Sequence, residues 1–397
     1  MYSFKIKLIF IISFVFFTFF ACRERTHIDN TSLAWKKNIT TGTNNLRTYI
    51  KNYKIKSSFL SYAKFPDGFI FLDNAGQTLY SYKTETDNQK YSISKNYYIF
   101  YHEKTVKKNR FKGHIIRFFS KSGSPIKVRK RKLYREKHPL PLNSIKTKGS
   151  PRISPNGSIV AIFDSAGINF ELYNNKGKQL ITPRTYGPLI TSYSFSRKND
   201  FFAVGYLNGA FAVFNNKGKE LFNKKVKVGK YHVIKSVFIS DDGEYIGVVA
   251  GIYPEYVLVF NKKGKLLWYN STGVNQRKRV FACFSQGKAK RVIVGIPGGA
   301  AIYNNPDGEF LNKIQFYRND TRHFFLFDAD GTEDGNIALS FSLKGSSYIQ
   351  LVNSRGFPTK RNYYPDAYMY LRFYNKGKTL FLQGNKNILC YHISRED

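Results

Sequence analysis

The eight residues Phe214–Leu221 read FNNKGKEL, and nearly the same octapeptide occurs at Tyr173–Leu180 as YNNKGKQL and at Phe260–Leu267 as FNKKGKLL. Each copy places an aromatic residue before Asn-x-Lys-Gly-Lys. Asn favours the start of a tight turn, and Gly tolerates the left-handed conformation that such a turn requires. The octapeptide therefore predicts a β-hairpin that the chain uses repeatedly.

The hairpin glycine recurs along most of the chain. Related turns contain a glycine at positions 76, 123, 177, 218, 264, 308 and 356, and successive gaps are 47, 54, 41, 46, 44 and 48 residues. These gaps match the length of one propeller blade. A second polar turn, such as ISPNG at Ile153–Gly157 or ISDDG at Ile239–Gly243, separates two apolar strands in each unit. Each unit thus predicts four antiparallel strands, which make one blade of a β-propeller.

The two ends of the chain predict how the ring closes. The last unit, residues 367–397, is one strand short, whereas Gly68–Lys83 (GFIFLDNAGQTLYSYK) offers a strand pair with no preceding half-blade. An N-terminal strand that completes the last blade would leave no sheet edge unpaired. We therefore predict an all-β propeller over residues 59–397 with seven four-stranded blades. Eight blades are the alternative if residues 32–85 form a blade of their own.

The composition supports a folded, sheet-rich chain with an extreme charge. Hydrophobic residues make up 42% and aromatic residues 17% of the 397 residues, and the net charge is +38. Such a field attracts anions such as phosphate-rich lipid, lipopolysaccharide, acidic glycan or nucleic acid. A Lys- and Asn-rich bias on solvated strand faces would account for the same charge.

The N-terminus has the pattern of an export signal. An apolar run of 14 residues, Leu8–Ala21, follows two lysines and is followed at once by Cys22. This run is too short to cross a bilayer as a helix, so residues 1–21 are predicted to be a signal peptide. The residues Phe19–Cys22 resemble a bacterial lipoprotein box, which implies lipid attachment at Cys22 and a membrane partner through that anchor; an uncleaved anchor or simple secretion is the alternative.

Several expectations follow from this export signal. Residues 22–58 are predicted to be a linker after the lipidated Cys22. Arg23, in place of the Asp that retains lipoproteins of enteric bacteria in the inner membrane, favours the outer membrane of the cell envelope. Because an exported chain does not meet nucleic acid, we predict no nucleic-acid partner despite the basic composition.

The densest positive charge lies between the second and third glycine hairpins. Residues 104–137 contain 14 Lys or Arg and one Glu. The 54-residue gap between Gly123 and Gly177 predicts an insertion that projects from the ring. Its arginines could bind phosphate or an acidic glycan through paired hydrogen bonds, and a solvated loop without function is the alternative. The candidate anion-binding residues are Arg129, Lys130, Arg131, Lys132 and Arg135.

Three carboxylates surround a glycine turn at residues 327–336 (FDADGTEDGN). Asp328, Asp330 and Asp334 alternate around Gly331 in a way that resembles calcium loops. Leu326, however, occupies the place of a first ligand, and no Glu completes the set. These three residues are weak metal candidates, and an ordinary turn is the favoured interpretation.

Tyrosines gather in residues 361–370 (RNYYPDAYMY). Tyr363, Tyr364 and Tyr368 are predicted to form an aromatic binding face, since tyrosine gives a large contact area at little entropic cost. The alternative is that alternate tyrosines pack between sheets.

Motifs for catalysis are missing from the sequence. The seven His residues have no metal-binding spacing, and there is neither a Gly-x-Ser-x-Gly elbow nor a Cys that pairs with a nearby His. We therefore predict a protein that is not an enzyme and holds no cofactor. The alternative is an envelope hydrolase or lactonase, for which carboxylates or His would have to converge at the mouth of the central channel.

The blade repeats ISPNGSIVAIF (Ile153–Phe163) and ISDDGEYIGVVAG (Ile239–Gly251) resemble those of bacterial WD-repeat-like and quinoprotein-like propellers. The WD dipeptide of the former and the blade-docking tryptophans of the latter are absent, apart from Trp268, and the GH pair does not recur from blade to blade. Together with the lipoprotein box, the sequence is similar to the propeller lipoproteins of outer-membrane protein assembly. This resemblance implies a lipid-anchored scaffold that binds a protein or an anionic envelope polymer.

Overall fold

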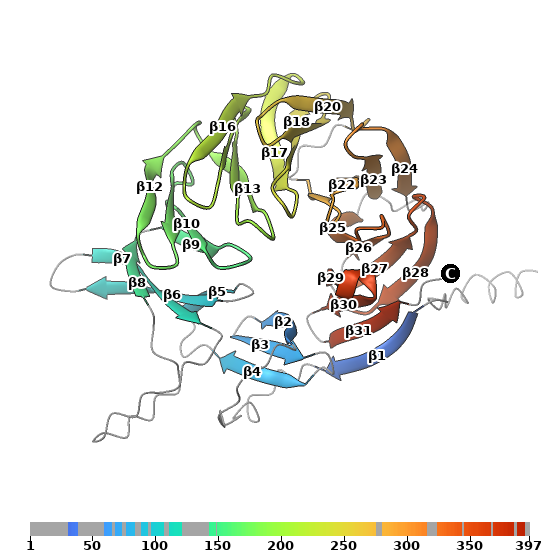
Figure 1. Cartoon of the computed structure of the whole chain (residues 1–397), viewed down its shortest axis with the longest axis horizontal. Helices are drawn as coiled ribbons and strands as arrows, with labels where there is room; N and C mark the ends of the chain where they lie inside the picture. Colours follow the sequence, from blue (N-terminus) through green and yellow to red (C-terminus); the bar gives the residue numbers. More distant parts are fainter. Residues whose placement is uncertain are drawn as a thin grey trace, which may run out of the picture.

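The computed structural model describes residues 31–38, 59–65, 68–73, 77–83, 89–93, 97–106, 111–120, 143–147, 149–274, 280–315, 324–343, 345–366, 368–384 and 387–393. Its strands form eight antiparallel sheets. Figure 1 shows these sheets as the blades of a ring around a central opening. The predicted all-β propeller is therefore confirmed.

Each blade takes its strands from one continuous segment of the chain, with one exception. Blade 1 contains β2 (Phe59–Phe65), β3 (Gly68–Asp73) and β4 (Thr78–Lys83); blade 2 contains β5 (Gln89–Ile93), β6 (Tyr97–Val106), β7 (Phe111–Ser120) and β8 (Asn143–Thr147). Blade 3 contains β9 (Ser150–Ile153), β10 (Ile159–Phe163), β11 (Phe170–Asn174) and β12 (Gln179–Arg184); blade 4 contains β13 (Ile190–Phe195), β14 (Phe202–Tyr206), β15 (Ala210–Phe214) and β16 (Glu220–Lys225).

The second half of the ring continues this order. Blade 5 contains β17 (Tyr231–Ile239), β18 (Tyr245–Ile252), β19 (Tyr256–Asn261) and β20 (Leu266–Ser271); blade 6 contains β21 (Ala282–Phe284), β22 (Arg291–Ile296), β23 (Gly299–Asn304) and β24 (Phe310–Gln315). Blade 7 contains β25 (Phe325–Gly331), β26 (Ile337–Leu343), β27 (Ser346–Val352) and β28 (Pro358–Tyr364). Blade 8, the exception, combines β29 (Tyr370–Tyr374), β30 (Thr379–Gln383) and β31 (Asn387–Ile393) with β1 (Thr31–Asn38).

The described strands form seven sheets of four strands and one sheet of three strands, which makes eight sheets where seven blades were predicted. The three-stranded sheet, blade 1, lies within residues 32–85, the segment that the eight-blade alternative assigned to an additional blade. In each four-stranded blade the first strand lies nearest the ring centre and the fourth lies at the rim (Figure 1).

An N-terminal strand closes the ring, as the chain ends predicted. Strand β1 pairs antiparallel with β31, so that Thr31 lies opposite Ile393 and Asn38 opposite Asn387. The closing strand is nevertheless not the one expected. Strands β3 and β4 of Gly68–Lys83 pair with each other and with β2, and the strand that closes the ring comes from residues 22–58, where a linker was predicted.

The apolar core lies between neighbouring blades. Every residue of the middle strands β14 and β15 is buried, whereas the outer strand β16 is half-buried or exposed. Phe202 and Phe214 of blade 4 pack with Phe170 of blade 3, with ring centroids 5.3 and 5.4 Å from Phe170. The two apolar faces of a blade are therefore covered by its neighbours, which is why a single blade is not a stable unit.

The repeated octapeptide forms the hairpin between the third and fourth strands. In blade 5 the Asn261 Oδ1 accepts hydrogen bonds from the backbone amides of Lys263 (3.0 Å) and Lys265 (2.9 Å), and Gly264 has φ +80°. A Cβ on Gly264 would lie 2.8 Å from the Phe222 ring of blade 4. Glycine is therefore required twice, for the left-handed backbone and for the approach of the preceding blade. The same amide contacts occur at Asn174, Asn215 and Asn353.

A serine or threonine fixes the turn between the first and second strands. In blade 5 the Ser240 hydroxyl accepts a hydrogen bond from the Tyr245 amide at 3.0 Å. This contact explains why ISPNG and ISDDG have similar sequences, because the hydroxyl satisfies an amide that the turn leaves unpaired. Equivalent contacts are Ser154 with Ile159, Ser196 with Phe201, Ser285 with Arg291 and Thr332 with Asn336.

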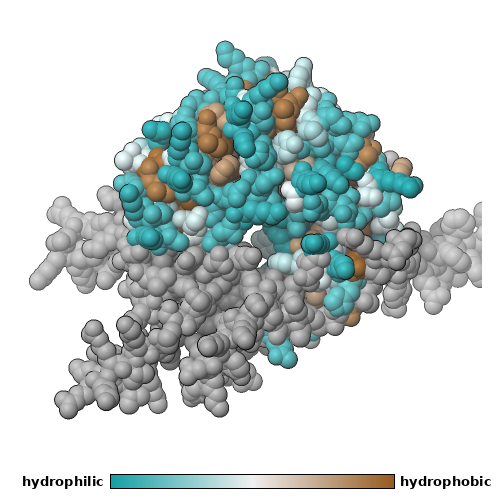
Figure 2. All heavy atoms as spheres, in the orientation of Figure 1, coloured by the Kyte–Doolittle hydropathy of each residue, from teal (hydrophilic) through white to brown (hydrophobic). Residues whose placement is uncertain are grey.

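The alternation of strands gives the ring two different faces. The face that carries the turns after the first and third strands is called the hairpin face; in blade 3 the Asn175 amide joins its two turns by donating to the Ser158 carbonyl at 3.1 Å. The opposite face is called the loop face, where the Leu207 amide donates to the Leu189 carbonyl at 2.9 Å. The described surface seen in Figure 2 is largely hydrophilic, with apolar side chains in separate patches. Within the described ranges, no helix is long and apolar enough to cross a bilayer.

Candidate functional site

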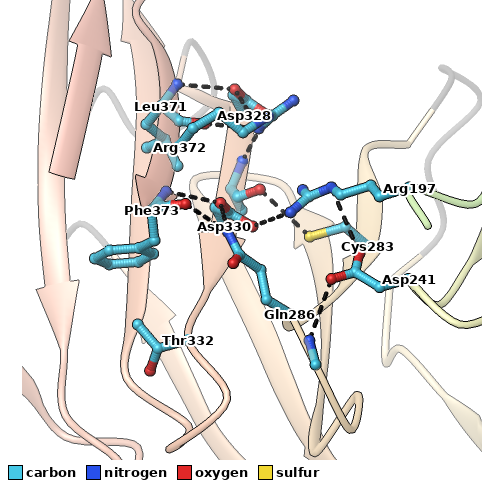
Figure 3. A network of polar contacts seen from close by, with 12 residues as sticks. Arg197, Asp241, Cys283, Gln286, Asp328, Asp330, Thr332, Leu371, Arg372 and Phe373 are labelled. Atoms are coloured by element: carbon cyan, nitrogen blue, oxygen red, sulfur yellow. Dashed lines mark hydrogen bonds and ion pairs between the residues drawn. The ribbon is translucent and has the colours of Figure 1, made fainter. Parts of the chain in front are cut away.

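Polar side chains from five blades meet on the inner side of the ring (Figure 3). Asp330 of the innermost strand β25 is fully buried. Its Oδ1 accepts a hydrogen bond from Arg197 Nη1 at 2.9 Å, and its Oδ2 accepts from the Phe373 amide at 2.9 Å and from Gln286 Nε2 at 2.7 Å. Arg197 follows β13 in blade 4, so its contact with blade 7 passes across the interior of the ring. We call Arg197, Asp241, Gln286, Asp328, Asp330 and Arg372 the axial network.

Asp328 links blades 7 and 8 within this network. Its Oδ2 accepts from the Leu371 amide at 3.0 Å, and Arg372 Nη1 lies 3.2 Å from the same oxygen. Burial raises the pKa of Asp328, and the Arg372 guanidinium and the Leu371 amide act against this rise. The residue therefore joins the inner strands of two blades.

Asp241 links blades 4, 5 and 6. Its Oδ1 lies 3.7 Å from Arg197 Nε, and its Oδ2 accepts from the Gly287 amide at 3.2 Å. Burial raises the pKa of Asp241. Burial also opposes the positive charge of Arg197, but the carboxylates of Asp330 and Asp241 outweigh this effect and raise the Arg197 pKa.

The axial network is the place where the enzyme alternative required carboxylates to converge, and three of them are there. Each forms an ion pair with a guanidinium and accepts a hydrogen bond from a backbone amide of another blade, so these contacts link the strands of neighbouring blades. The network therefore fixes the relative positions of blades 4 to 8.

The three Asp residues of residues 327–336 do not surround one cation. Asp328 and Asp330 lie on β25 and bind the partners named above, whereas Asp334 is exposed in the turn before β26. Among the residues that the structure describes, no group of three or more His, Cys, Asp or Glu is arranged to hold a metal ion. The calcium-loop interpretation of Asp328, Asp330 and Asp334 is thus not supported, because two of these carboxylates are bound inside the ring.

The three tyrosines predicted as one binding face lie in two places. Tyr363 and Tyr364 belong to β28 at the rim; Tyr363 is exposed, whereas the Tyr364 hydroxyl lies 3.0 Å from that of Tyr391 in blade 8. Tyr368 instead precedes the innermost strand β29. Since successive residues of a strand point to opposite sides, Tyr363 and Tyr364 cannot share one surface.

Tyr368 belongs to an aromatic group that the sequence did not reveal. Its ring centroid lies 5.2 Å from that of Phe327, which in turn lies 4.8 Å from that of Tyr370. Tyr368 has φ +59°, a backbone conformation that bulky residues rarely adopt and that is often found at functional sites. We call Phe325, Phe327, Tyr368 and Tyr370 the inner aromatic cluster.

The loop face also carries a shallow pocket of about 760 Å³ between blades 4 and 5. Leu207, Tyr231 and Tyr253 expose 42%, 53% and 43% of their surface there, an unusual arrangement for apolar side chains that border one depression. The ammonium group of Lys230 lies 5.8 Å from the Tyr231 ring centroid. The pocket lining, which contains no acidic residue, is formed by Leu207, Asn208, Lys225, Lys230, Tyr231, His232, Val233, Ile252 and Tyr253.

Sequence reasoning missed this pocket because its residues come from two blades and three loops. One local signal was available. Leu207 lies in the turn of YLNGA, and Tyr253 precedes Pro254, so two large apolar residues occupy positions where a polar turn residue is usual. The remaining predicted residues lie outside the described ranges: Cys22, Arg129, Lys130, Arg131, Lys132 and Arg135.

Known proteins support the same architecture. A family model described as a β-propeller protein matches residues 127–304. Among solved structures, BamB from Moraxella catarrhalis superposes with a TM-score of 0.55 and 12% identity, covering 91% of this chain and 100% of that one. Sqt1 from Chaetomium thermophilum superposes with a TM-score of 0.53 and 12% identity, covering 83% and 82%. No curated protein sequence matches the chain. These likenesses show that the chain has the β-propeller fold.

Proposed function

We propose that this propeller is a lipid-anchored scaffold of the bacterial cell envelope, attached to the outer membrane through Cys22, which binds a protein partner without catalysing a reaction. The observation that carries the proposal is the loop-face pocket with its exposed Leu207, Tyr231 and Tyr253. Tyrosine and apolar anchors beside a pocket are typical of protein interfaces. The similarity in fold to BamB, which covers that whole chain, supports the same interpretation.

The charge of the pocket defines the chemistry of the partner. Lys225 and Lys230 border the apolar side chains, and the lining residues include no carboxylate to neutralise them. An extended segment with an apolar anchor and neighbouring Asp or Glu residues would match this pocket in both respects. The partner is therefore proposed to be an envelope protein with such an exposed segment.

Photocrosslinking in intact cells tests the proposal. A photoreactive amino acid at Leu207 or Tyr253 should yield a discrete protein adduct, and one at Asn216 on the hairpin face should not. The substitution Tyr231→Ala removes an anchoring ring and should reduce the yield of the adduct about tenfold or more, as expected for an interface anchor. Equal adduct yields at both faces, or adducts that are unchanged by Tyr231→Ala, would contradict a binding role for the pocket.

The basic insertion is proposed to add a second, electrostatic contact with an anionic envelope polymer. Replacing Arg129, Lys130, Arg131 and Lys132 by Ser should weaken retention on immobilised lipopolysaccharide, and the effect should disappear at high salt because exposed charges are screened there. Unchanged retention of this variant would contradict a role of the insertion in binding the anionic polymer.

A further inference from the structure

The closing strand shows on which face the N-terminal segment enters the ring. In blade 8, β31 runs toward the hairpin face and β1 runs away from it, because the two strands are antiparallel and β1 takes the place of a fourth strand. Thr31, the first residue of β1, lies opposite Ile393. The Ile393 amide donates to the carbonyl of Lys378, which follows the first turn of blade 8 on the hairpin face, at 2.9 Å. The chain therefore enters the propeller on the hairpin face.

The distance to the proposed anchor is short. Cys22 precedes Thr31 by nine positions. A fully extended chain covers about 3.3–3.6 Å per residue, so nine residues span at most about 30 Å. A lipid on Cys22 thus keeps the start of β1, and with it the hairpin face, within about 30 Å of the bilayer surface.

The hairpin face is also where exposed lysines gather. The octapeptide places them on both sides of its glycine, at the tips of neighbouring blades, and the Asn contacts described above hold each tip in a defined conformation. The exposed lysines of these three hairpins are Lys176, Lys178, Lys217, Lys219, Lys262, Lys263 and Lys265. Other exposed cations in turns of this face are Lys198, Lys288, Lys290, Arg355, Lys376 and Lys378.

Acidic side chains offset only part of this charge. Lys262 forms an ion pair with Glu244 at 2.7 Å. Within the described residues, none of the other lysines of these three hairpins forms an ion pair with a carboxylate. The exposed acidic residues in turns of this face are Glu244, Asp307, Glu309, Glu333 and Asp334. They belong to blades 5, 6 and 7, so among the described residues the turns of blades 3 and 4 on this face present exposed lysines and no exposed acid.

We propose that the hairpin face docks on an anionic phospholipid surface, which holds the ring flat against the membrane and turns the loop face toward the partner. This inference rests on the lipid attachment at Cys22 that the proposed function includes. Lysines within a Debye length of an anionic bilayer are attracted to it, and several act together. The anchor supplies the proximity, and the lysines supply the orientation.

Lysine footprinting of the full-length lipoprotein tests this orientation. The protein is reconstituted into phosphatidylcholine vesicles with or without phosphatidylglycerol, acetylated briefly at low salt, and analysed by mass spectrometry. Anionic lipid should slow acetylation of Lys176, Lys217 and Lys263 roughly fivefold, and high salt should abolish the protection. Lys225 and Lys230 on the loop face are internal controls whose acetylation should not change.

Matched variants separate the effect of the lysine charges from the effect of the lipid anchor. Replacing Lys217, Lys219, Lys263 and Lys265 by Gln should remove the protection that remains at Lys176 and Lys178, whereas Lys225→Gln with Lys230→Gln should leave it intact. Flotation with vesicles reports the anchor independently. If the protein floats with the vesicles but the lysines of both faces are acetylated at equal rates, the docking of the hairpin face is contradicted and the lipid anchor is not. A protein that does not float would overturn the anchor, and the docking inference with it.

Discussion

Asp330 illustrates how single residues hold the ring together from the inside. Its carboxylate is completely buried and touches blades 4, 6 and 8 through Arg197, Gln286 and the Phe373 amide. A buried ion is tolerated when charge and hydrogen bonds satisfy it, and the loss of one partner leaves the other uncompensated.

Replacing Asp330 by Asn should therefore destabilise the fold by about 3 kcal/mol, since Arg197 loses its closest counter-charge. The free energy of unfolding in urea measures the effect. Asp307→Asn is the matched control, because Asp307 is exposed and its carboxylate accepts the Glu309 amide at 3.2 Å, a contact that Asn can keep; a change below about 0.5 kcal/mol is expected there. Equal stability of the two variants would mean that the axial network adds nothing to the fold.

Asp164 should make part of the stability depend on pH. Its carboxylate accepts hydrogen bonds from the Ile168 amide at 2.8 Å and from the Asn169 side chain at 2.8 Å. Burial opposes ionisation, but the hydrogen bonds from Asn169, Ile168 and Gly167 outweigh it and lower the pKa of Asp164 below its ordinary 3.8.

A lowered pKa in the folded state means that ionised Asp164 stabilises the fold above pH 3.8, and that this contribution is lost as the pH falls through the folded-state pKa. Asp164→Asn should accordingly cost about 1 kcal/mol at pH 7 and progressively less below pH 4. Urea unfolding at a series of pH values measures this difference. A cost that stays constant over this range would assign the effect to geometry rather than to charge.

At the scale of single elements, the hairpins were predictable and the axial network was not. The Asn-x-Lys-Gly-Lys hairpin is specified by neighbouring residues, since Asn261 binds amides two and four positions further on. The contact of Arg197 with Asp330 joins residues 133 positions apart and exists only once the blades form a ring. Local patterns therefore identify the turns, whereas contacts between blades follow from closure.

The contact between a hairpin glycine and the preceding blade can be measured with two substitutions. A Cβ on Gly308 would lie 2.6 Å from the Trp268 ring of blade 5, whereas a Cβ on Gly273, which also has a positive φ, would meet no atom within 4 Å. Gly273→Ala should cost about 1 kcal/mol through backbone strain alone. Gly308→Ala should cost about 2–3 kcal/mol more, because the added methyl displaces a buried ring.

Urea unfolding gives both free energies, and tryptophan fluorescence should respond to Gly308→Ala in the folded state and not to Gly273→Ala. Equal costs for the two variants would mean that the close approach of the blades has no energetic consequence. Trp268 is thus the residue of this chain that corresponds most closely to a blade-docking tryptophan, although a single residue does not establish the quinoprotein pattern.

For the whole molecule, ring closure was predictable and the identity of the closing strand was not. Sequence showed that the last unit lacked a strand, but residues 31–38 (TSLAWKKN) resemble a polar linker as much as a strand. Blade 1 has only three described strands, so the sequence pattern of a complete blade is missing there and the number of blades was hard to predict. The inner aromatic cluster and the loop-face pocket each combine residues from two blades, so no single segment contained them.

Moving the closing strand tests closure directly. Deletion of residues 31–38 should expose the edge of β31, lower the unfolding midpoint and promote aggregation, because an unpaired edge strand recruits other chains. Since Thr31 lies opposite Ile393, the same eight residues attached after Asp397 through a short turn should pair again with β31. Size-exclusion chromatography and urea unfolding should show a monomer of restored stability. A relocated strand that fails to restore either property, or a deletion without effect, would contradict closure by β1.

The pairing of Thr31 with Ile393 also bears on how the protein is made. Strand β1 leaves the ribosome, and in an exported protein the translocation channel, before any other strand of the described ring, yet its partner β31 is the last strand to emerge. Contacts between such distant positions form late and slowly. Until β31 has been synthesised, β1 is therefore a strand without its partner, and a chain interrupted before β31 cannot close the ring. The ring can therefore close only after β31 has been synthesised, and the unpaired edge of β1 distinguishes interrupted copies from closed ones.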